Sequence, residues 1–277
     1  MQIALCNEVI AAGRDFAAQC ALAATLGYDG LEVAPFTLDE TPHRLGEARV
    51  AALRRAAADA GVAISGLHWL LVKPAGLSIT SGDPTVRAAT LDVMHRLIDL
   101  SAALGGKLMV HGSPAQRRLP EGAERAAANQ RGIDAFAAIA EHAARAGIIY
   151  CVEPLARAET NFVNSLAEAA AIVTGIGNPA VRTMIDCSAA GRMEAEPLAA
   201  LVDRWLPTGL LAHIQVNDRN RRGPGQGEDE FAPLFAALRR HGYGGWVAVE
   251  PFDYQPDGPT CAARAIGFIR GILEAGA

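Results

Sequence analysis

The chain has 277 residues, of which 51% are hydrophobic and 20% are charged, and its formal net charge is −5. This acidic balance lacks the basic footprint of proteins that bind nucleic acid or anionic membranes, and no apolar run approaches the roughly 18 residues needed to span a bilayer. Five scattered cysteines without a CxxC pair argue against a disulfide framework or a thiolate zinc site. Because the chain also starts directly with an apolar strand, we expect a cytoplasmic protein without nucleic-acid or membrane partners.

Short apolar strands alternate with longer, alanine-rich segments along the whole chain. The predicted strands cover residues 3–6, 30–33, 62–68, 107–111, 148–152, 181–186, 211–216 and 246–250. Strands separated by segments of helical length are typical of βαβ units and a parallel sheet. Repeated over this chain length, the units favour a closed (β/α)8 TIM barrel, a single domain over residues 1–277. No GxGxxG motif follows the first strand, which weighs against a dinucleotide-binding fold.

Turn and cap residues mark where the helices between these strands begin and end. Gly27 follows a helix predicted over residues 15–26, and Gly147 closes another long helix. Asp83 and Pro84 have the residue types of an N-cap and of a first helical position. They follow a long insertion, residues 69–82, that comes after the third strand.

Three of the predicted strands lead into a carboxylate, namely Glu153, Asp186 and Glu250. In a barrel of parallel strands the chemistry lies at the C-terminal ends of the strands, so these side chains are expected to converge. Three carboxylates at one mouth repel one another unless one is protonated or a cation is bound. Oxygen ligands suit Mn²⁺, Mg²⁺ or a similar hard ion. The sequence therefore predicts a divalent metal site, although a single acid at a strand end is more often a solvated group or a helix N-cap.

The strand over residues 211–216 offers two further candidate ligands. His213 and Gln215 have the same parity, so both are expected to face the barrel interior. Gln215 lies nearer the C-terminal end, where its carbonyl oxygen could complete an oxygen set. Histidine is the commoner ligand in general, but a hydrogen-bonded core position deeper in the barrel is the alternative for His213. We take Gln215 as the candidate and leave His213 open.

Four segments carry a family resemblance: residues 153–164, the Met-Ile-Asp strand end at 184–186, and residues 217–228 and 242–252. In these segments the chain resembles the xylose-isomerase-like TIM-barrel sugar isomerases and epimerases, and within them the D-tagatose/D-psicose (ketose) 3-epimerase family. The resemblance covers the C-terminal half well and the N-terminal half only by architecture. It implies a small sugar or sugar-derived substrate, and a homodimer or homotetramer is expected because barrels of this group often pair.

The resemblance also implies roles for individual residues. Glu153, Asp186, the strand ligand (Gln215) and Glu250 would bind the metal, with Mn²⁺ expected first and Mg²⁺ or Co²⁺ as alternatives. Glu153 and Glu250 would also be the catalytic acid/base pair. Glu159 and Arg221 would contact substrate hydroxyl groups.

Two positions depart from the epimerase pattern. The ketose 3-epimerases have a histidine where this chain has Gln215, whereas the hydroxypyruvate isomerase branch, which has a similar His-Ile-Gln strand, uses glutamine. The epimerases also carry a substrate-binding histidine three residues past the metal aspartate, where this chain has Ala189. One sugar contact is therefore absent, and the usual hexulose substrate is not implied.

Three further side chains at strand ends are candidate substrate contacts. His68 and Trp69 close the third strand, where an aromatic ring could cover an apolar face of a sugar and exclude water; loop packing is the alternative. His111 ends the fourth strand and is either a substrate contact or a capping hydrogen-bond group. The full candidate substrate-binding set is Glu159, Arg221, His68, Trp69, His111 and His213.

The expected activity is ketose 3-epimerisation, in which a proton leaves and returns through an enediolate that the metal stabilises. Transfer from two sides inverts a carbon centre, whereas one-sided return to the neighbouring carbon gives aldose–ketose isomerisation of the hydroxypyruvate isomerase type. A sugar lyase or dehydratase on the same site is a further alternative. A DNA-repair nuclease like endonuclease IV is disfavoured, since Ala189 and residues 227–230 lack its ligands and the net charge is acidic.

Overall fold

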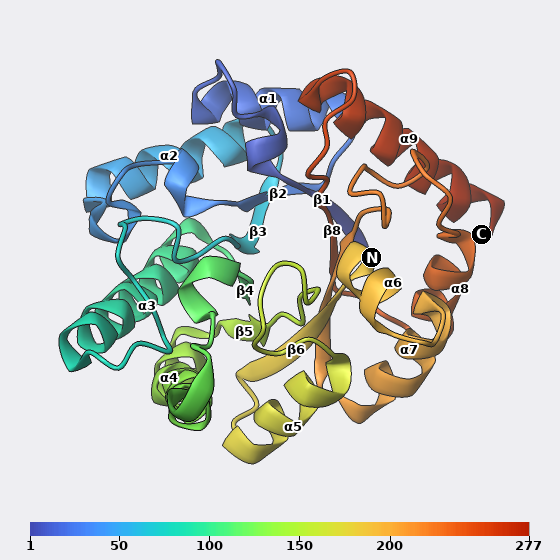
Figure 1. The fold of residues 1–277 in the computed structure, drawn as a ribbon. Coiled ribbons are helices and arrows are strands. Elements are labelled where there is room, and N and C mark those ends of the chain that lie inside the picture. The colour runs from blue at the N-terminus through green and yellow to red at the C-terminus, as the bar shows by residue number, and fades with distance from the viewer. Residues whose placement is uncertain (277) are drawn as a thin grey trace.

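Parallel strands close into a barrel in the computed structural model, which describes residues 1–276 (Figure 1). The strands are β1 (Gln2–Cys6), β2 (Gly30–Val33), β3 (Ala63–Leu67), β4 (Leu108–His111), β5 (Ile149–Val152), β6 (Val181–Asp186), β7 (Leu211–Val216) and β8 (Trp246–Val249). Each strand pairs with its successor in the chain, and β8 pairs with β1 to close the ring. The (β/α)8 barrel predicted from the sequence is therefore confirmed, and every predicted strand end lies within one residue of its observed position.

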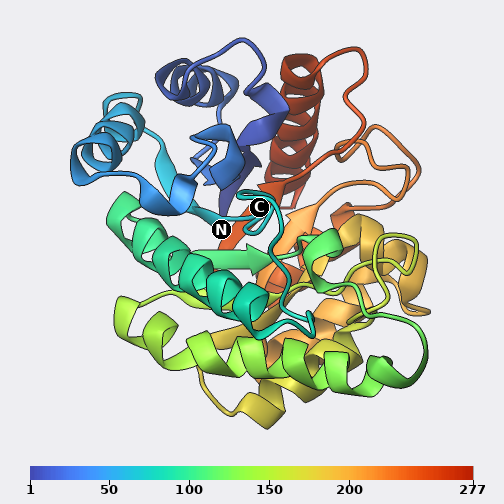
Figure 2. The ribbon, with the colours of Figure 1, turned by 60° about the vertical axis from the view of Figure 1, so that its left-hand side comes forward.

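Helices surround the barrel, as Figure 1 shows. They are α1 (Phe16–Leu26), α2 (Glu47–Asp59), α3 (Pro84–Leu104), α4 (Arg125–Ala146), α5 (Leu166–Ile176), α6 (Cys187–Met193), α7 (Leu198–Trp205), α8 (Ala232–Arg240) and α9 (Gly258–Ala275). The predicted caps are present, because Asp83 accepts a hydrogen bond from the Thr85 amide and Gly27 ends α1 at a φ of 91°. In Figure 2, α3 and α4 lie side by side along one flank of the barrel.

Short 3₁₀ helices lie in the loops that connect these elements. They are η1 (Asn7–Ile10), η2 (Pro35–Thr37), η3 (Pro42–Arg44), η4 (Pro114–Arg117), η5 (Gly122–Glu124) and η6 (Leu206–Thr208). Of these, η1 directly follows β1 and η4 begins three residues after the end of β4, so both lie near the barrel mouth. None of the described helices is long and apolar enough to cross a lipid bilayer.

The core has two parts of unequal size. The larger part lies between the strands and the surrounding helices. Inside the barrel, a small apolar cluster contains Leu108, Val110, Cys151 and Met184. Other interior positions carry fully buried polar side chains, Glu32 on β2 and both His213 and Gln215 on β7. A buried polar network therefore lies within the barrel, and buried polar groups of this kind require partners.

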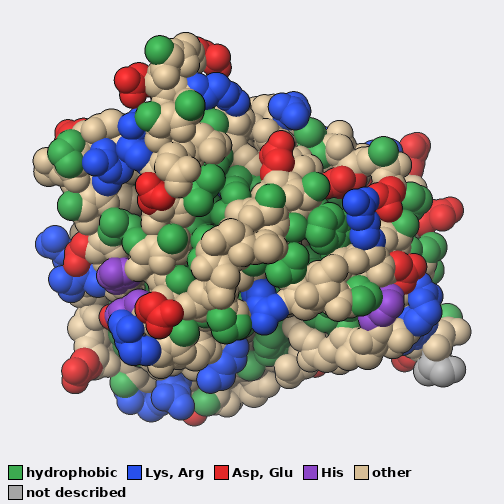
Figure 3. All heavy atoms as spheres, turned by 90° about the horizontal axis from the view of Figure 1, so that it is seen from below, with side chains coloured by type: hydrophobic (Ala, Val, Ile, Leu, Met, Phe, Trp, Pro, Cys, Tyr) green, Lys and Arg blue, Asp and Glu red, His purple; other side chains and the backbone are tan. Residues whose placement is uncertain are grey.

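The outer surface is chemically mixed. On the face seen in Figure 3, lysine and arginine side chains alternate with acidic ones and with small apolar areas. Among the described side chains, this face carries no continuous basic stripe of the kind that binds nucleic acid.

Candidate metal and acid/base site

Three carboxylates converge at the C-terminal end of the barrel. Glu153 directly follows β5, Asp186 ends β6, and Glu250 directly follows β8. One oxygen of each lies within 4.8 Å of the others, and all three residues are buried. Asp186 is held in place as the N-cap of α6, since its carboxylate accepts a hydrogen bond of 2.7 Å from the Ala189 amide. The structure thus brings together the three acids that the strand pattern predicted as neighbours.

Burial and mutual repulsion make these carboxylates poor at holding negative charge. Burial raises the pKa of Glu153 well above its usual value, and the nearby Glu250 and Asp186 carboxylates raise it further. Burial raises the pKa of Asp186 to about 6, although hydrogen bonds to its carboxylate oppose the shift. Burial also raises the pKa of Glu250 to about 8, against the opposing effect of a hydrogen bond from His68. The cluster therefore retains protons near neutral pH unless a cation compensates its charge.

Gln215 presents an unpaired oxygen on the strand next to that of Asp186. It lies opposite Asp186 on the neighbouring strand, and its amide nitrogen donates a 2.8 Å hydrogen bond to Glu32 Oε1. A carboxylate only accepts hydrogen bonds, so the Gln215 nitrogen has to face Glu32. Its Oε1 is buried and, among the described residues, has no hydrogen-bond partner. A buried acceptor without a partner is unfavourable unless a ligand binds it.

His213 lies deeper in the barrel, where its Nδ1 is 3.1 Å from the Trp246 carbonyl oxygen, a hydrogen-bond contact. Its Nε2 is 2.8 Å from Glu32 Oε2, an ion-pair distance without the geometry of a hydrogen bond. Burial acts to raise the pKa of Glu32, but His213 outweighs it and holds this pKa below its usual value. His213 is fully buried. The geometry thus favours the hydrogen-bonded core position for His213 and places it neither as a ligand nor as a substrate contact.

The donor set fits a hard divalent cation. It consists of oxygen atoms, the carboxylates of Glu153, Asp186 and Glu250 together with the free amide oxygen of Gln215. Such an oxygen set suits Mn²⁺ or Mg²⁺, whereas zinc prefers thiolate and imidazole ligands. Gln215 Oε1 is one of several buried polar atoms without a hydrogen-bond partner, and it is the one that lies on the strand next to Asp186.

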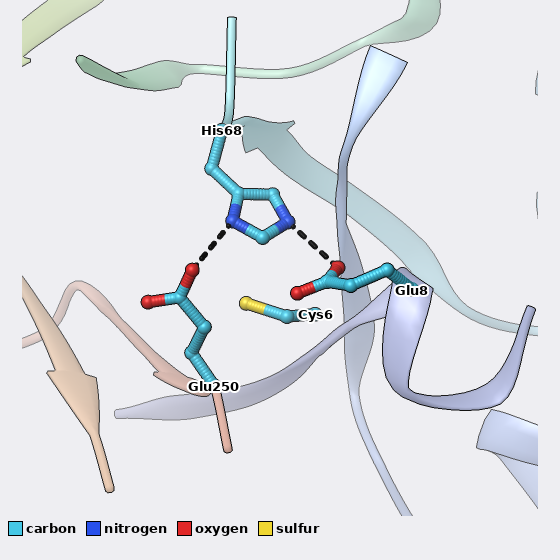
Figure 4. Close-up of side chains that lie close together, drawn as sticks. All are labelled: Cys6, Glu8, His68 and Glu250. Carbon is cyan, nitrogen blue, oxygen red and sulfur yellow. Dashed lines mark hydrogen bonds and ion pairs between the residues drawn. The ribbon is translucent and has the colours of Figure 1, made fainter. Parts of the chain in front are cut away.

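His68 and Trp69 both form hydrogen bonds with Glu250. Figure 4 shows the contact from His68. His68 Nδ1 is 3.0 Å from Glu250 Oε1, and His68 Nε2 is 2.9 Å from Glu8 Oε2. The Trp69 indole donates a 3.1 Å hydrogen bond to the same Glu250 oxygen. Burial by itself lowers the pKa of His68, but the Glu8 and Glu250 carboxylates outweigh it and hold this pKa well above its usual value.

A pocket opens beside the carboxylates. Its walls include Trp69, Leu155 and Phe252, and Glu153, Glu159 and Glu250 also line it. Trp69 and Phe252 meet edge to face with ring centroids 6.4 Å apart. Apolar walls around a few polar groups are typical of small-molecule sites, but the free volume of this pocket is only about 20 Å³.

The two residues that the resemblance assigns to substrate hydroxyls lie around this pocket. The Glu159 carboxylate accepts a 3.3 Å hydrogen bond from the Arg192 guanidinium and a 3.1 Å hydrogen bond from the Ala156 amide. The Arg221 guanidinium is exposed and lies over the Phe252 ring, 4.8 Å from its centroid. Arg192 was not foreseen from the sequence, because nothing in its spacing distinguishes it from a solvated helical arginine.

The profile of the xylose isomerase-like TIM barrel family matches residues 20–272. The chain belongs to this family. A D-psicose 3-epimerase of Agrobacterium fabrum is 31% identical, over 83% of this chain and 76% of the relative. A Streptomyces coelicolor protein provisionally named hydroxypyruvate isomerase is 28% identical over 87% of this chain and 86% of the relative. The family resemblance indicated by the sequence motifs is thereby confirmed.

Solved structures of this family share the fold of the chain. A crystal structure of D-psicose 3-epimerase in the presence of D-fructose has a TM-score of 0.81 at 24% identity, covering 99% of both chains. A 3-keto-D-glucoside 4-epimerase from E. coli has a TM-score of 0.83 at 21% identity, covering 98% of this chain and 99% of that one. At such identities the likeness establishes the barrel and not the activity.

In this xylose isomerase-like barrel, the structure does not bring His111 to the site. Its Nδ1 is 2.7 Å from the Tyr150 hydroxyl, and its ring packs edge to face on Phe136 of α4 at 5.0 Å. Val110 lines the pocket instead. Burial, with a smaller effect of Arg117, lowers the pKa of His111 to about 3. His111 is therefore a neutral core histidine facing the helices, and its expected substrate contact is not supported.

Arg117 is a buried cation that sequence reasoning missed. It is fully buried on η4, and its guanidinium donates a 3.2 Å hydrogen bond to the His111 carbonyl. Burial lowers its pKa to about 10, while the nearby Glu153 and Glu159 carboxylates oppose the shift. Arg117 and Arg118 are adjacent in the chain, and no pattern shows which of the two turns inward.

Proposed function

We propose that this protein is a divalent-metal-dependent epimerase or isomerase acting on a small sugar, with ketose 3-epimerisation as the first candidate. The observation that carries the proposal is the convergence of Glu153, Asp186 and Glu250 beside the unpaired oxygen of Gln215. Relatives named as ketose epimerases support the substrate class. The same residues would hold the cation, Mn²⁺ by preference.

The chain supplies a base and an acid on different sides of the barrel mouth. A bound cation supplies Lewis-acid stabilisation of negative charge on the substrate oxygens. Glu153 and Glu250 follow β5 and β8, which are not adjacent in the ring, so their carboxylates can approach a substrate carbon from two directions. One carboxylate removes the proton next to the carbonyl group, and the other delivers a proton to the opposite face. The carbon is thereby inverted, and no atom is gained or lost.

Aldose–ketose isomerisation is the second candidate, favoured by one residue. Gln215 takes the place of the histidine that the epimerases have at this position, and the relative provisionally named hydroxypyruvate isomerase covers most of this chain. In this reaction the proton returns to the neighbouring carbon, so one carboxylate suffices for both transfers. Both reactions require proton exchange, and they differ in where the proton returns.

Proton NMR in D₂O separates these possibilities. Purified protein with Mn²⁺ is incubated with a panel of ketoses, tetruloses and hydroxypyruvate. Deuterium at C3 of a ketose together with its epimer is the expected result. Deuterium at C1 or C2 with an aldehyde product would instead support the isomerase. Absence of exchange in every compound, with metal bound, would contradict both candidates for these substrates.

Glu32→Gln is expected to weaken Mn²⁺ binding without touching a ligand. The Glu32 carboxylate fixes the Gln215 amide with its oxygen outward, whereas a glutamine at position 32 can accept or donate and so releases that constraint. Changes to residues that orient ligands typically cost about 10–100-fold in metal affinity. The dissociation constant is measured from the free-Mn²⁺ signal in electron paramagnetic resonance.

The matched control is Glu121→Gln, because Glu121 is exposed and lies in the loop before α4. It makes the same chemical change and should leave the affinity unaltered. Equal affinities for the two variants and the wild type would show that Glu32 does not orient a ligand.

Without metal, the protein is expected to become less stable as the pH rises towards 8. The folded state holds protons on Asp186 and Glu250, whose pKa values are raised to about 6 and about 8. In the unfolded chain the same carboxyl groups lose their protons at about pH 4. Between about pH 4 and about pH 8 the folded state therefore binds more protons than the unfolded state. The free energy of unfolding therefore falls as the pH rises through this range.

A bound cation would replace those protons and reverse the trend. The increase in melting temperature on replacing EDTA by Mn²⁺ should be larger at about pH 8 than at about pH 5.5. Differential scanning calorimetry in both conditions measures it. An increase that does not depend on pH would contradict proton displacement from these carboxylates.

A further inference from the structure

His68 forms a bridge between two carboxylates at the barrel mouth. Figure 4 shows its ring between Glu250 and Glu8, with one nitrogen directed at each. The two contacts measure 3.0 and 2.9 Å, and His68 is fully buried. With both nitrogens directed at carboxylates, the ring has no direction left in which to contact a substrate by hydrogen bonding.

Two donors meet on a single oxygen of Glu250. His68 Nδ1 and the Trp69 indole both bind Oε1, which leaves Oε2 for the carboxylate cluster. Trp69 adopts a φ of 52°, in the left-handed region that a bulky side chain rarely occupies. The surroundings therefore hold Trp69 in an unfavourable backbone conformation, and its indole is directed at Glu250.

Glu153 lacks a comparable anchor. Within residues 1–276, no side chain forms a hydrogen bond of normal geometry with its carboxylate, although the buried cation of Arg117 lies near it. The glycine at position 112 leaves the room that the Glu153 carboxylate occupies. Of the two carboxylates with the proposed acid/base role, one is therefore fixed by two donors and the other, among the described residues, by no side-chain hydrogen bond.

We propose that His68, braced by Glu8, is a positioning residue that fixes the orientation of Glu250. It holds Oε1 and thereby leaves Oε2 available to a bound cation or to proton transfer, and Trp69 supports the same Oε1. The inference rests on the proposed role of Glu250 in metal binding and proton transfer. It makes the two carboxylates unequal, with the geometry of Glu250 dependent on His68 and that of Glu153 independent of it.

The same atoms could instead be ligands of a second cation. Cys6, Glu8, His68 and Glu250 each offer an atom within 4.8 Å of the others. However, the ring of His68 already lies between the two carboxylates as their hydrogen-bonding partner, so the cluster is satisfied without an ion. Metal stoichiometry distinguishes the two arrangements.

Two substitutions of His68 separate its two contacts. His68→Asn places an amide nitrogen near the position of Nδ1, so the contact to Glu250 remains and that to Glu8 is lost. His68→Gln places its amide nitrogen near Nε2, so the contact to Glu8 remains and that to Glu250 is lost. Both variants are neutral amides, which makes them controls for each other. Mn²⁺ binding is measured by electron paramagnetic resonance, and both metal-free variants are crystallised.

The expected result is wild-type affinity within a few-fold for H68N and a loss of about 10–100-fold for H68Q, with one Mn²⁺ bound per chain. In the crystals the Glu250 carboxylate should keep its orientation in H68N and turn in H68Q. Equal affinities together with an unchanged Glu250 in both variants would overturn the proposal, as would a second bound ion that both variants lose. If the wild type binds no Mn²⁺, the proposed function fails, and the orientation of Glu250 in the crystals still decides the role of His68.

Discussion

Glu153→Gln is expected to slow, by about 10²–10⁴-fold, the exchange with D₂O of the substrate hydrogen on the Glu153 side, the usual contribution of a positioned acid or base. The amide cannot take up a proton, but it keeps the shape of the side chain and one oxygen for a cation. Because the substitution also removes a buried carboxyl group that would repel Glu250 and Asp186 on ionising, the metal-free variant should melt at the same temperature or higher. Exchange is followed by proton NMR and melting by calorimetry.

The companion variant is Glu250→Gln. If the two carboxylates serve opposite faces of the substrate, each variant loses epimerisation but retains hydrogen exchange with one of the two epimers. In a one-base isomerase, only one of the two variants loses exchange. Full exchange in Glu153→Gln with both epimers would show that Glu153 is not the base. Glu121→Gln makes the same chemical change at an exposed position, and it should leave the exchange rates at the wild-type values.

The barrel and its three acids could be predicted because both depend on local patterns. Apolar runs of strand length recur between helical segments, and caps such as Asp83 fix where the helices begin. Once the strands are parallel and consecutive, geometry alone brings Glu153, Asp186 and Glu250 to one mouth. No side-chain packing detail enters that argument.

Side-chain partners far apart in the chain could not be predicted in the same way. His68 and Glu250 are 182 residues apart, and nothing in either segment indicates the other. His68 and His111 looked alike as histidines at strand ends. His68 lies just past β3 and turns into the mouth, whereas His111 is still within β4, where strand alternation directs it towards α4. A difference of one residue in the strand end therefore decides which histidine reaches the site.

Gly112→Ala is expected to lower activity by about 10²-fold while leaving the fold intact. A Cβ at this position would clash with Glu153 Oε2, closer than real contacts allow, and would lie 3.3 Å from its carboxyl carbon. The carboxylate has no side-chain hydrogen bond to hold it and is expected to turn away rather than displace the backbone at position 112. Misplacement of a reacting group by about 1 Å can cost about 10²-fold in rate, and Mn²⁺ affinity should fall with it because the same oxygen belongs to the ligand cluster.

The matched control is Gly82→Ala, because a Cβ there meets no atom within 4 Å and the backbone of Gly82 is not in the left-handed region. Both substitutions add one methyl group to a loop glycine, so a loss confined to position 112 reports on Glu153. Circular dichroism and the melting temperature establish that both variants fold. Wild-type exchange rates in Gly112→Ala would mean that the Glu153 carboxylate works from a different position, and its pairing with Glu250 across the mouth would then have to be abandoned.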